Sequence, residues 1–201
     1  NGITPLVRQS EIELISEEDT WSRPYLVDFD GDGTVEILNM YDNNTGNLYT
    51  IDHNGKLVKS NGFDFGTSYY CMGDFNADGK TDVITMGTTG KPDTGWEMNS
   101  STGMTGEGET SFVSEPITSL FNPKNKQIFV ADINGDGFDD LYVVGEKTNK
   151  NQTCPVNIYI NDRTGKNFSH YTGSNTVGTD KANFRIADFN GDGKADFICY
   201  P

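Results

Sequence analysis

Short apolar runs alternate with acidic, glycine-containing loops along most of the chain. The runs are rich in Val, Ile, Phe and Tyr and only a few residues long, a pattern that favours strands over helices. They precede the loops at residues 25–27, 70–72, 128–130 and 184–186, and follow them at 35–38, 82–85, 141–144 and 197–200. Each loop is therefore predicted to join the two strands of a hairpin.

A second hairpin is predicted after each of the first three loops. Its turns fall at Asn54-Gly55, Thr102-Gly103 and Thr164-Gly165, and its strands include residues 47–51, 95–98 and 156–160. Two hairpins make four strands per repeat, and the loops begin at residues 28, 74, 132 and 188, which is the spacing of propeller blades. We expect an all-β fold, a β-propeller of four-stranded blades with about four blades in this chain.

The whole chain, 1–201, is expected to form one propeller domain or a fragment of one. Its repeats are predicted at 23–68, 69–126, 127–182 and 183–201, the last completed by residues 1–20. Strand-like pieces at 3–7 and 11–15 could close a four-bladed ring in this way. Equally, the chain could be an arc of a larger ring that self-associates through a second copy.

The acidic loops span residues 28–36, 74–82, 132–140 and 188–196. Each places oxygen-bearing side chains at positions 1, 3, 5 and 9 and glycine at position 6, and the carbonyl of position 7 adds another oxygen, a donor set suited to calcium. The expected ligands are Asp28, Asp30, Asp32, Thr34 and Glu36; Asp74, Asn76, Asp78, Lys80 and Asp82; Asp132, Asn134, Asp136, Phe138 and Asp140; and Asp188, Asn190, Asp192, Lys194 and Asp196. The sequence thus predicts up to four Ca²⁺ ions.

The loops differ from EF-hands, which need flanking helices and a glutamate at position 12. That position holds Asn39, Thr85, Val143 and Cys199. Position 2 is always apolar, as Phe29, Phe75, Ile133 or Phe189, and is expected to fill the seam between neighbouring sheets.

Composition and charge add to this picture. The formal charge of −15 argues against nucleic acid or anionic membranes as partners. Of the 30 acidic residues, 13 occupy loop positions 1, 3, 5 or 9, so their repulsion without metal should make folding depend on calcium.

No stretch is long and apolar enough for membrane insertion. Cys71, Cys154 and Cys199 are favoured as core thiols, with one disulfide as the alternative.

The loop motif, repeated between strands at this spacing, resembles the FG-GAP/VCBS repeats of calcium-binding β-propellers, as in integrin α-subunits. Segments 96–103 and 158–165 also look like repeats of bacterial toxin-complex and Rhs-related proteins. The resemblance implies structural calcium sites at the residues above. Glu36 at position 9 and Ala77 at position 4 depart from the pattern, and neither is expected to abolish binding.

No sequence motif of a common catalytic class is present, and neither His53 nor His170 is expected to be catalytic. The leading hypothesis is a secreted or cell-surface adhesion module, not an enzyme, that binds a glycan or an extracellular protein. Trp21 and Trp96 could stack on a sugar, although packing between blades is the favoured role of each aromatic residue. Alternatives are a scaffold part of a larger secreted enzyme or toxin and, as the weakest, a polysaccharide lyase.

Overall fold

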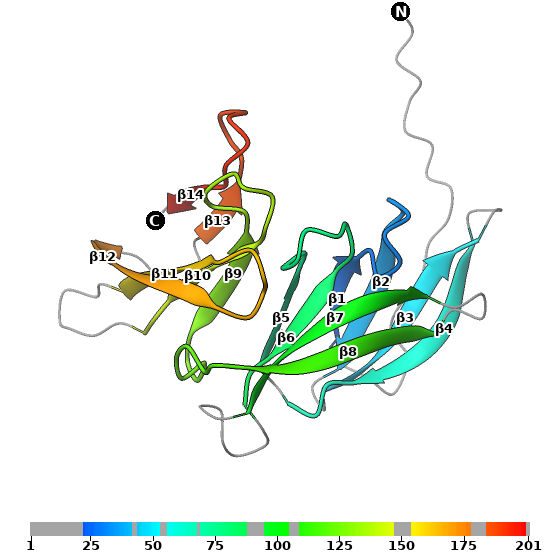
Figure 1. The fold of residues 1–201 in the computed structure, drawn as a ribbon. Coiled ribbons are helices and arrows are strands. Elements are labelled where there is room, and N and C mark those ends of the chain that lie inside the picture. The colour runs from blue at the N-terminus through cyan, green and yellow to red at the C-terminus, as the bar shows by residue number, and fades with distance from the viewer. Residues whose placement is uncertain are drawn as a thin grey trace, which may run out of the picture.

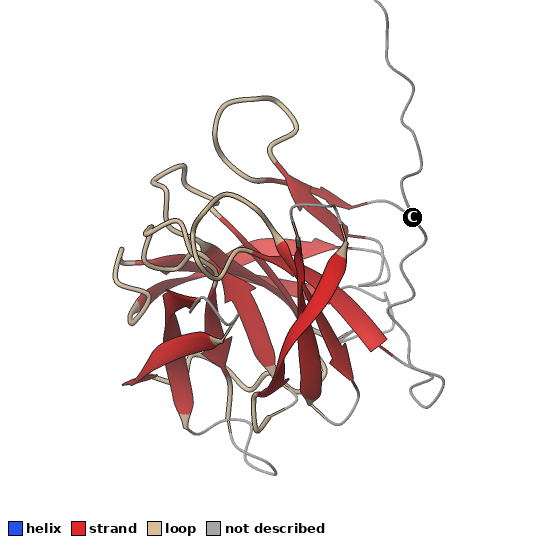
Figure 2. Cartoon of the chain, turned by 90° about the vertical axis from the view of Figure 1, so that its right-hand side faces the viewer, coloured by secondary structure: helices blue, strands red, loops and turns tan. Residues whose placement is uncertain are grey.

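Strands form all the regular structure in the part of the chain that can be described. A computed structural model describes residues 22–41, 44–52, 56–67, 69–87, 95–104, 109–146, 154–177 and 184–199. None of these residues is helical (Figure 2). Accordingly, these residues include no helix that could span a membrane. The all-β prediction is confirmed.

The strands form three four-stranded antiparallel sheets and one two-stranded sheet, each in chain order. The first sheet contains β1 (Ser22–Val27), β2 (Glu36–Tyr41), β3 (Thr45–Ile51) and β4 (Leu57–Asp64). The second contains β5 (Tyr70–Gly73), β6 (Asp82–Thr85), β7 (Trp96–Met104) and β8 (Thr110–Ile117). The third contains β9 (Gln127–Ala131), β10 (Asp140–Val144), β11 (Cys154–Asn161) and β12 (Phe168–Val177), and the last contains β13 (Phe184–Ala187) and β14 (Asp196–Cys199).

Each acidic loop joins the first and second strands of its sheet, as the sequence predicted. In Figure 1 these four connections project to the same side of the molecule. β5 lies beside β9, and β9 beside β13, so the first strands of successive sheets are neighbours. This arrangement brings the four loops into a row.

The second hairpins agree with the sequence in one of two testable cases. At Thr164-Gly165 the turn is confirmed, because the Asn161 Oδ1 accepts the N–H groups of Arg163, Thr164 and Gly165 at 3.1, 3.2 and 2.9 Å. The turn expected at Thr102-Gly103 is wrong. β7 continues through both residues to Met104, and Thr102 is the extra residue of a β-bulge against β8, next to Gly103, whose φ is +102°. The Asn54-Gly55 turn lies outside the described residues, as do the segments 3–7 and 11–15.

Apolar clusters fill the seams between successive sheets. The seam between the first two sheets contains Val27, Phe29, Leu38, Met40 and Val83, and the next contains Phe75, Ile84, Trp96, Leu141 and Tyr159. The last contains Val144 and Phe184, with Phe129, Tyr142 and Phe197 packed against them. Trp96 is 1% exposed and packs edge-on against Phe121, so its predicted core role is confirmed. Cys71 and Cys154 are buried thiols, as favoured above, while Trp21, His53 and the Cys199 side chain are outside the described part.

Loop position 2 fills the seam in the first two loops. Phe29 and Phe75 are each 0% exposed, and each touches a phenylalanine of the following sheet, Phe112 at 5.4 Å and Phe168 at 6.4 Å between ring centroids. Ile133 is half-buried. For Phe189 the expectation is wrong, because its ring is 52% exposed where no further described sheet covers it.

This difference gives a matched pair of substitutions. Phe75→Ala should destabilise the protein by about 3–5 kcal/mol, because it leaves a cavity in a sealed seam. Phe189→Ala should change the free energy of unfolding by no more than about 0.5 kcal/mol, because its ring is largely in solvent. Urea denaturation of the two variants checks this, and equal effects would contradict the assigned seam.

Candidate functional site

The first carboxylate of each loop lies at the centre of that loop's hydrogen bonds. In the first loop the Asp28 Oδ1 accepts the N–H of Gly31 at 2.7 Å and the Oδ2 accepts that of Gly33 at 3.0 Å. The third and fourth loops repeat this pattern on Asp132 and Asp188. In the second loop, Asp74 accepts the N–H groups of Asp78 and Gly79. The backbone donors of Gly193 and Gly191 hold the pKa of Asp188 below its ordinary value.

Positions 3 and 5 continue the pattern. The N–H of position 5 donates to the side chain at position 3, and the N–H of position 7 donates to the side chain at position 5, at 2.6–3.2 Å in all four loops. The glycine at position 6 has a φ between +81° and +88° in every loop, a conformation that glycine adopts without strain. Ala77, at position 4, has a φ of +57°, a left-handed backbone conformation that is strained for a residue with a Cβ. The other three loops have glycine at this position, which adopts the conformation without strain.

The carboxylate at position 9 ties each loop to its sheet. Glu36, Asp82, Asp140 and Asp196 accept the N–H of position 2 in their own loops, at 2.9–3.2 Å. In the second and third loops the other carboxylate oxygen accepts a third-strand N–H, from Ser101 at 2.9 Å and Asn161 at 2.7 Å.

Burial and crowding raise the pKa of these position 9 groups. Burial is the larger cause for Glu36 and Asp82, and repulsion from the other loop carboxylates adds to it, so the pKa of each is about 7. The pKa of Asp140 is raised for the same reasons.

Three of the predicted ligands come together in the first loop. One carboxylate oxygen each from Asp28, Asp30 and Glu36 lies within 4.8 Å of the other two. The remaining loops have the same backbone turn, with Asn in place of Asp at position 3. Oxygen donors, positive-φ glycines and carboxylates that repel one another fit a hard divalent cation of calcium's size. Every predicted ligand therefore lies in a loop with this turn, and calcium binding by these residues stays a prediction.

Neighbouring loops are also in direct contact, which the sequence analysis did not anticipate. The N–H groups of Thr81, Asp139 and Ala195 donate to the carbonyls of Asp28, Asp74 and Asp132, at 2.6, 3.0 and 2.8 Å. Third-strand side chains add further links, from the Ser101 Oγ to the Phe29 carbonyl at 2.6 Å and from the Asn161 Nδ2 to the Phe75 carbonyl at 2.8 Å. The sequence signal was a polar residue at position 8 in two of the loops.

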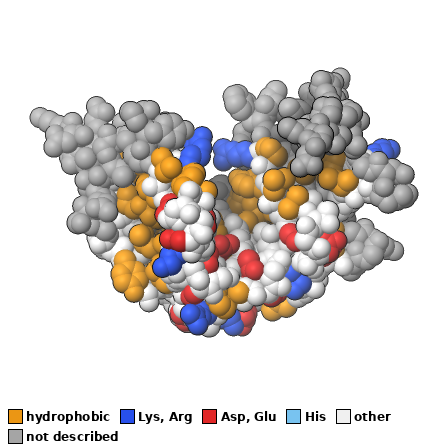
Figure 3. All heavy atoms as spheres, turned by 90° about the horizontal axis from the view of Figure 1, so that it is seen from above, with side chains coloured by type: hydrophobic (Ala, Val, Ile, Leu, Met, Phe, Trp, Pro, Cys, Tyr) orange, Lys and Arg blue, Asp and Glu red, His pale blue; other side chains and the backbone are white. Residues whose placement is uncertain are grey.

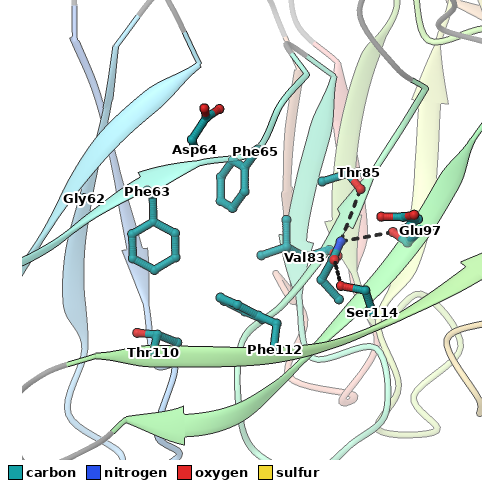
Figure 4. A pocket seen from close by; sticks show the side chains of 11 residues that line it. Gly62, Phe63, Asp64, Phe65, Val83, Thr85, Glu97, Thr110, Phe112 and Ser114 are labelled. Atoms are coloured by element: carbon teal, nitrogen blue, oxygen red, sulfur yellow. Dashed lines mark hydrogen bonds between the residues drawn. The ribbon is translucent and has the colours of Figure 1, made fainter.

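A pocket of about 450 Å³ lies between the first two sheets, within the usual range for small-molecule sites. It is lined by β4 and the residues after it, by β6 and β7, and by β8: Gly62, Phe63, Asp64, Phe65, Val83, Thr85, Glu97, Asn99, Thr110, Phe112 and Ser114. The rings of Phe63, Phe65 and Phe112 point toward one another across it (Figure 4).

Polar groups are held at the other side of this pocket. The Asn99 Nδ2 donates to the Thr85 Oγ1 at 3.2 Å and to the Val83 carbonyl at 3.0 Å, and the Ser114 Oγ donates to the Asn99 Oδ1 at 2.6 Å (Figure 4). Asp64 and Glu97 bring two carboxylates, whereas none of the described residues that line the pocket is a lysine or arginine. Asp and Glu side chains also recur across the face seen from above (Figure 3).

This pocket could not be inferred from the sequence, because its residues come from two repeats. Phe63 and Phe112 are 49 positions apart and their rings are 6.1 Å apart. His170 lies elsewhere, stacked on Tyr159 with its Nε2 at 2.9 Å from the Asn157 Oδ1.

Comparison with protein families gives three overlapping matches. A model of the FG-GAP-like repeat matches residues 28–85, 74–143 and 132–199. Each match begins at position 1 of one loop and extends through the next loop. The finer resemblance to VCBS, toxin-complex and Rhs-related repeats stays a prediction. No curated protein matches the chain.

Among solved structures, a lectin from Agrocybe aegerita has a similar fold. Its description states specific recognition of non-reducing terminal N-acetylglucosamine. The TM-score is 0.57 at 20% sequence identity, and the match covers 87% of this chain and 45% of the lectin chain. At this identity the likeness concerns the fold alone, and the present chain spans under half of that lectin.

The raised pKa values predict how the calcium-free protein responds to pH. Glu36 and Asp82 bind a proton more tightly in the folded state than in the unfolded chain, so protonation stabilises the fold. That stabilisation is complete below the unfolded pKa of about 4 and is lost as pH rises through about 7. The urea midpoint of calcium-free protein should therefore fall between about pH 5 and pH 8. The double variant Glu36→Gln, Asp82→Asn should flatten this fall, and a midpoint that rises over the same range would contradict the assignment.

Proposed function

Because the chain belongs to the FG-GAP-like repeat family, we propose that it is a calcium-stabilised, non-catalytic module that binds a neutral glycan. It is a β-propeller or an arc of one, with the sheets as blades. Sheets that stack through apolar seams, with their first strands side by side, support this architecture.

Calcium binding is supported by the donor set and by the crowding of its carboxylates. Four loops present oxygen donors on the same turn, and in the first of them three carboxylates lie within 4.8 Å of one another. A bound cation would neutralise charge that otherwise opposes folding. Loops of this kind commonly have affinities of about 0.1–1 mM in extracellular modules, which favours a secreted or cell-surface location.

The observation that carries glycan binding is the pocket between the first two sheets. Half-buried Phe63, Phe65 and Phe112 offer apolar ring faces for the C–H face of a pyranose. Asp64 and Glu97 can accept hydrogen bonds from sugar hydroxyls. With two carboxylates and no basic side chain among the described residues of its lining, the pocket favours a neutral sugar over a sialylated or sulfated one. The recognition of terminal N-acetylglucosamine by the Agrocybe lectin makes that sugar the first probe.

Glu97→Gln tests the site without disturbing the core, because Glu97 is exposed and glutamine has the same shape as glutamate. We expect binding to an immobilised chitooligosaccharide, which ends in N-acetylglucosamine, to weaken about tenfold, as for a lost hydrogen bond to a charged group. Surface plasmon resonance in millimolar calcium measures the change.

Glu115→Gln is the matched control. Glu115 lies on β8 outside the pocket lining, in an exposed ion pair with Lys166 at 2.6 Å, and its replacement should leave binding unchanged. If both variants bind as the original protein does, the pocket is not the sugar site. If a glycan array yields only sialylated or sulfated ligands, the neutral-glycan proposal is wrong.

A further inference from the structure

In the second, third and fourth loops, position 8 lies directly against position 1 of the preceding loop. The N–H of Thr81 donates to the Asp28 carbonyl at 2.6 Å, and Asp139 and Ala195 repeat this bond to Asp74 and Asp132 at 3.0 and 2.8 Å. The same bond thus recurs at all three junctions between the described loops.

At two junctions the position 8 side chain returns a second hydrogen bond. The Thr81 Oγ1 accepts the Asp28 N–H at 2.9 Å, and the Asp139 Oδ2 accepts the Asp74 N–H at 2.8 Å. At these two junctions, both the N–H and the carbonyl of position 1 form hydrogen bonds with a single residue of the next loop. Ala195 has no side-chain oxygen, so the junction between the third and fourth loops lacks this bond.

The junctions are also sterically tight. A Cβ added to Gly31 would lie 2.9 Å from the Lys80 Cγ, and one added to Gly73 would lie 2.5 Å from the Asp139 Oδ2. Glycine at these positions lets one loop approach the next. The loops therefore cannot move independently without breaking close contacts.

These contacts join candidate ligands of one loop to those of the next. Position 1 bears the carboxylate at the centre of its own loop, whereas position 8 lies between the ligand carbonyl of position 7 and the ligand carboxylate of position 9. A cation that orders one of these loops will reduce the entropy lost when the neighbouring loop is ordered.

We propose that Thr81 and Asp139 couple neighbouring calcium sites, so that calcium at one loop strengthens calcium binding at the next. This proposal rests on the proposed calcium binding by the loops. Coupling is strong between the first and second loops and between the second and third, and weak between the third and fourth. Thr81 and Asp139 are positioning residues that act through the ligands of the preceding loop.

Thr81→Val tests the coupling, because it removes only the accepting hydroxyl and keeps the shape of the side chain. Titration of metal-free protein with a calcium electrode should give an unchanged number of bound ions, an apparent affinity lower by up to about tenfold and a shallower curve. Thr81→Ser should restore the original curve. Ala195→Thr should add the missing bond and steepen the curve, and Thr118→Val, at an exposed site outside the loops, should change nothing.

A purely structural role for Thr81 predicts a different result. Thr81→Val would then lower the thermal midpoint equally with and without calcium and leave the calcium titration unchanged, which would overturn the coupling. Failure of the proposed calcium binding itself is recognisable separately, because the original protein would then take up no calcium.

Discussion

Repulsion between carboxylates that the backbone holds close together is the constraint on which this structure depends. One carboxylate oxygen each from Asp28, Asp30 and Glu36 lies within 4.8 Å of the other two. Burial, together with repulsion from the neighbouring carboxylates, raises the pKa of Glu36 to about 7. Near neutral pH such groups need a proton or a cation. A divalent cation would neutralise all of them at once, so under the proposed calcium binding, metal binding and folding would be one equilibrium.

The same loops hold the sheets together and shape the pocket. In the first two loops position 9 fixes the backbone of position 2, and the ring at position 2 fills the seam to the next sheet. Phe29 contacts Phe112, whose ring also lines the pocket between the first two sheets. Phe29 also stacks on Phe63 of the same pocket, so order in the first loop would reach the proposed sugar site through these two aromatic contacts. Calcium and glycan binding are therefore expected to be linked, although no cation need touch the sugar.

Local features of the fold could be predicted from the sequence because each is encoded within a few residues. Alternating apolar runs gave the strands around each loop, and the spacing of Asp28, Asp30 and Glu36 gave the candidate ligands. At Thr102-Gly103 the glycine indicated a turn, but pairing with β8 continues past it as a bulge, since tertiary pairing overrides a local turn signal.

Features made by two repeats could not be predicted in this way. The pocket joins Phe63 to Phe112, and the loop contact joins Asp28 to Thr81, across separations that a single sequence does not reveal. Phe189 shows the converse, since it shares the apolar character of Phe29 and yet is exposed where no described sheet follows. The apolar residue at position 2 predicted packing in a seam between sheets, but whether it is buried depends on whether a neighbouring sheet covers it.

Thermal unfolding of the metal-free protein, with and without added calcium, tests the central claim most directly. Excess EDTA gives the reference state, and millimolar magnesium is the control for general screening of charge, because magnesium demands a smaller octahedral site. The account predicts a large increase in the melting temperature with calcium and little with magnesium. Identical melting curves in EDTA and calcium would contradict it, because the loop carboxylates would then be held without the cation that their geometry fits.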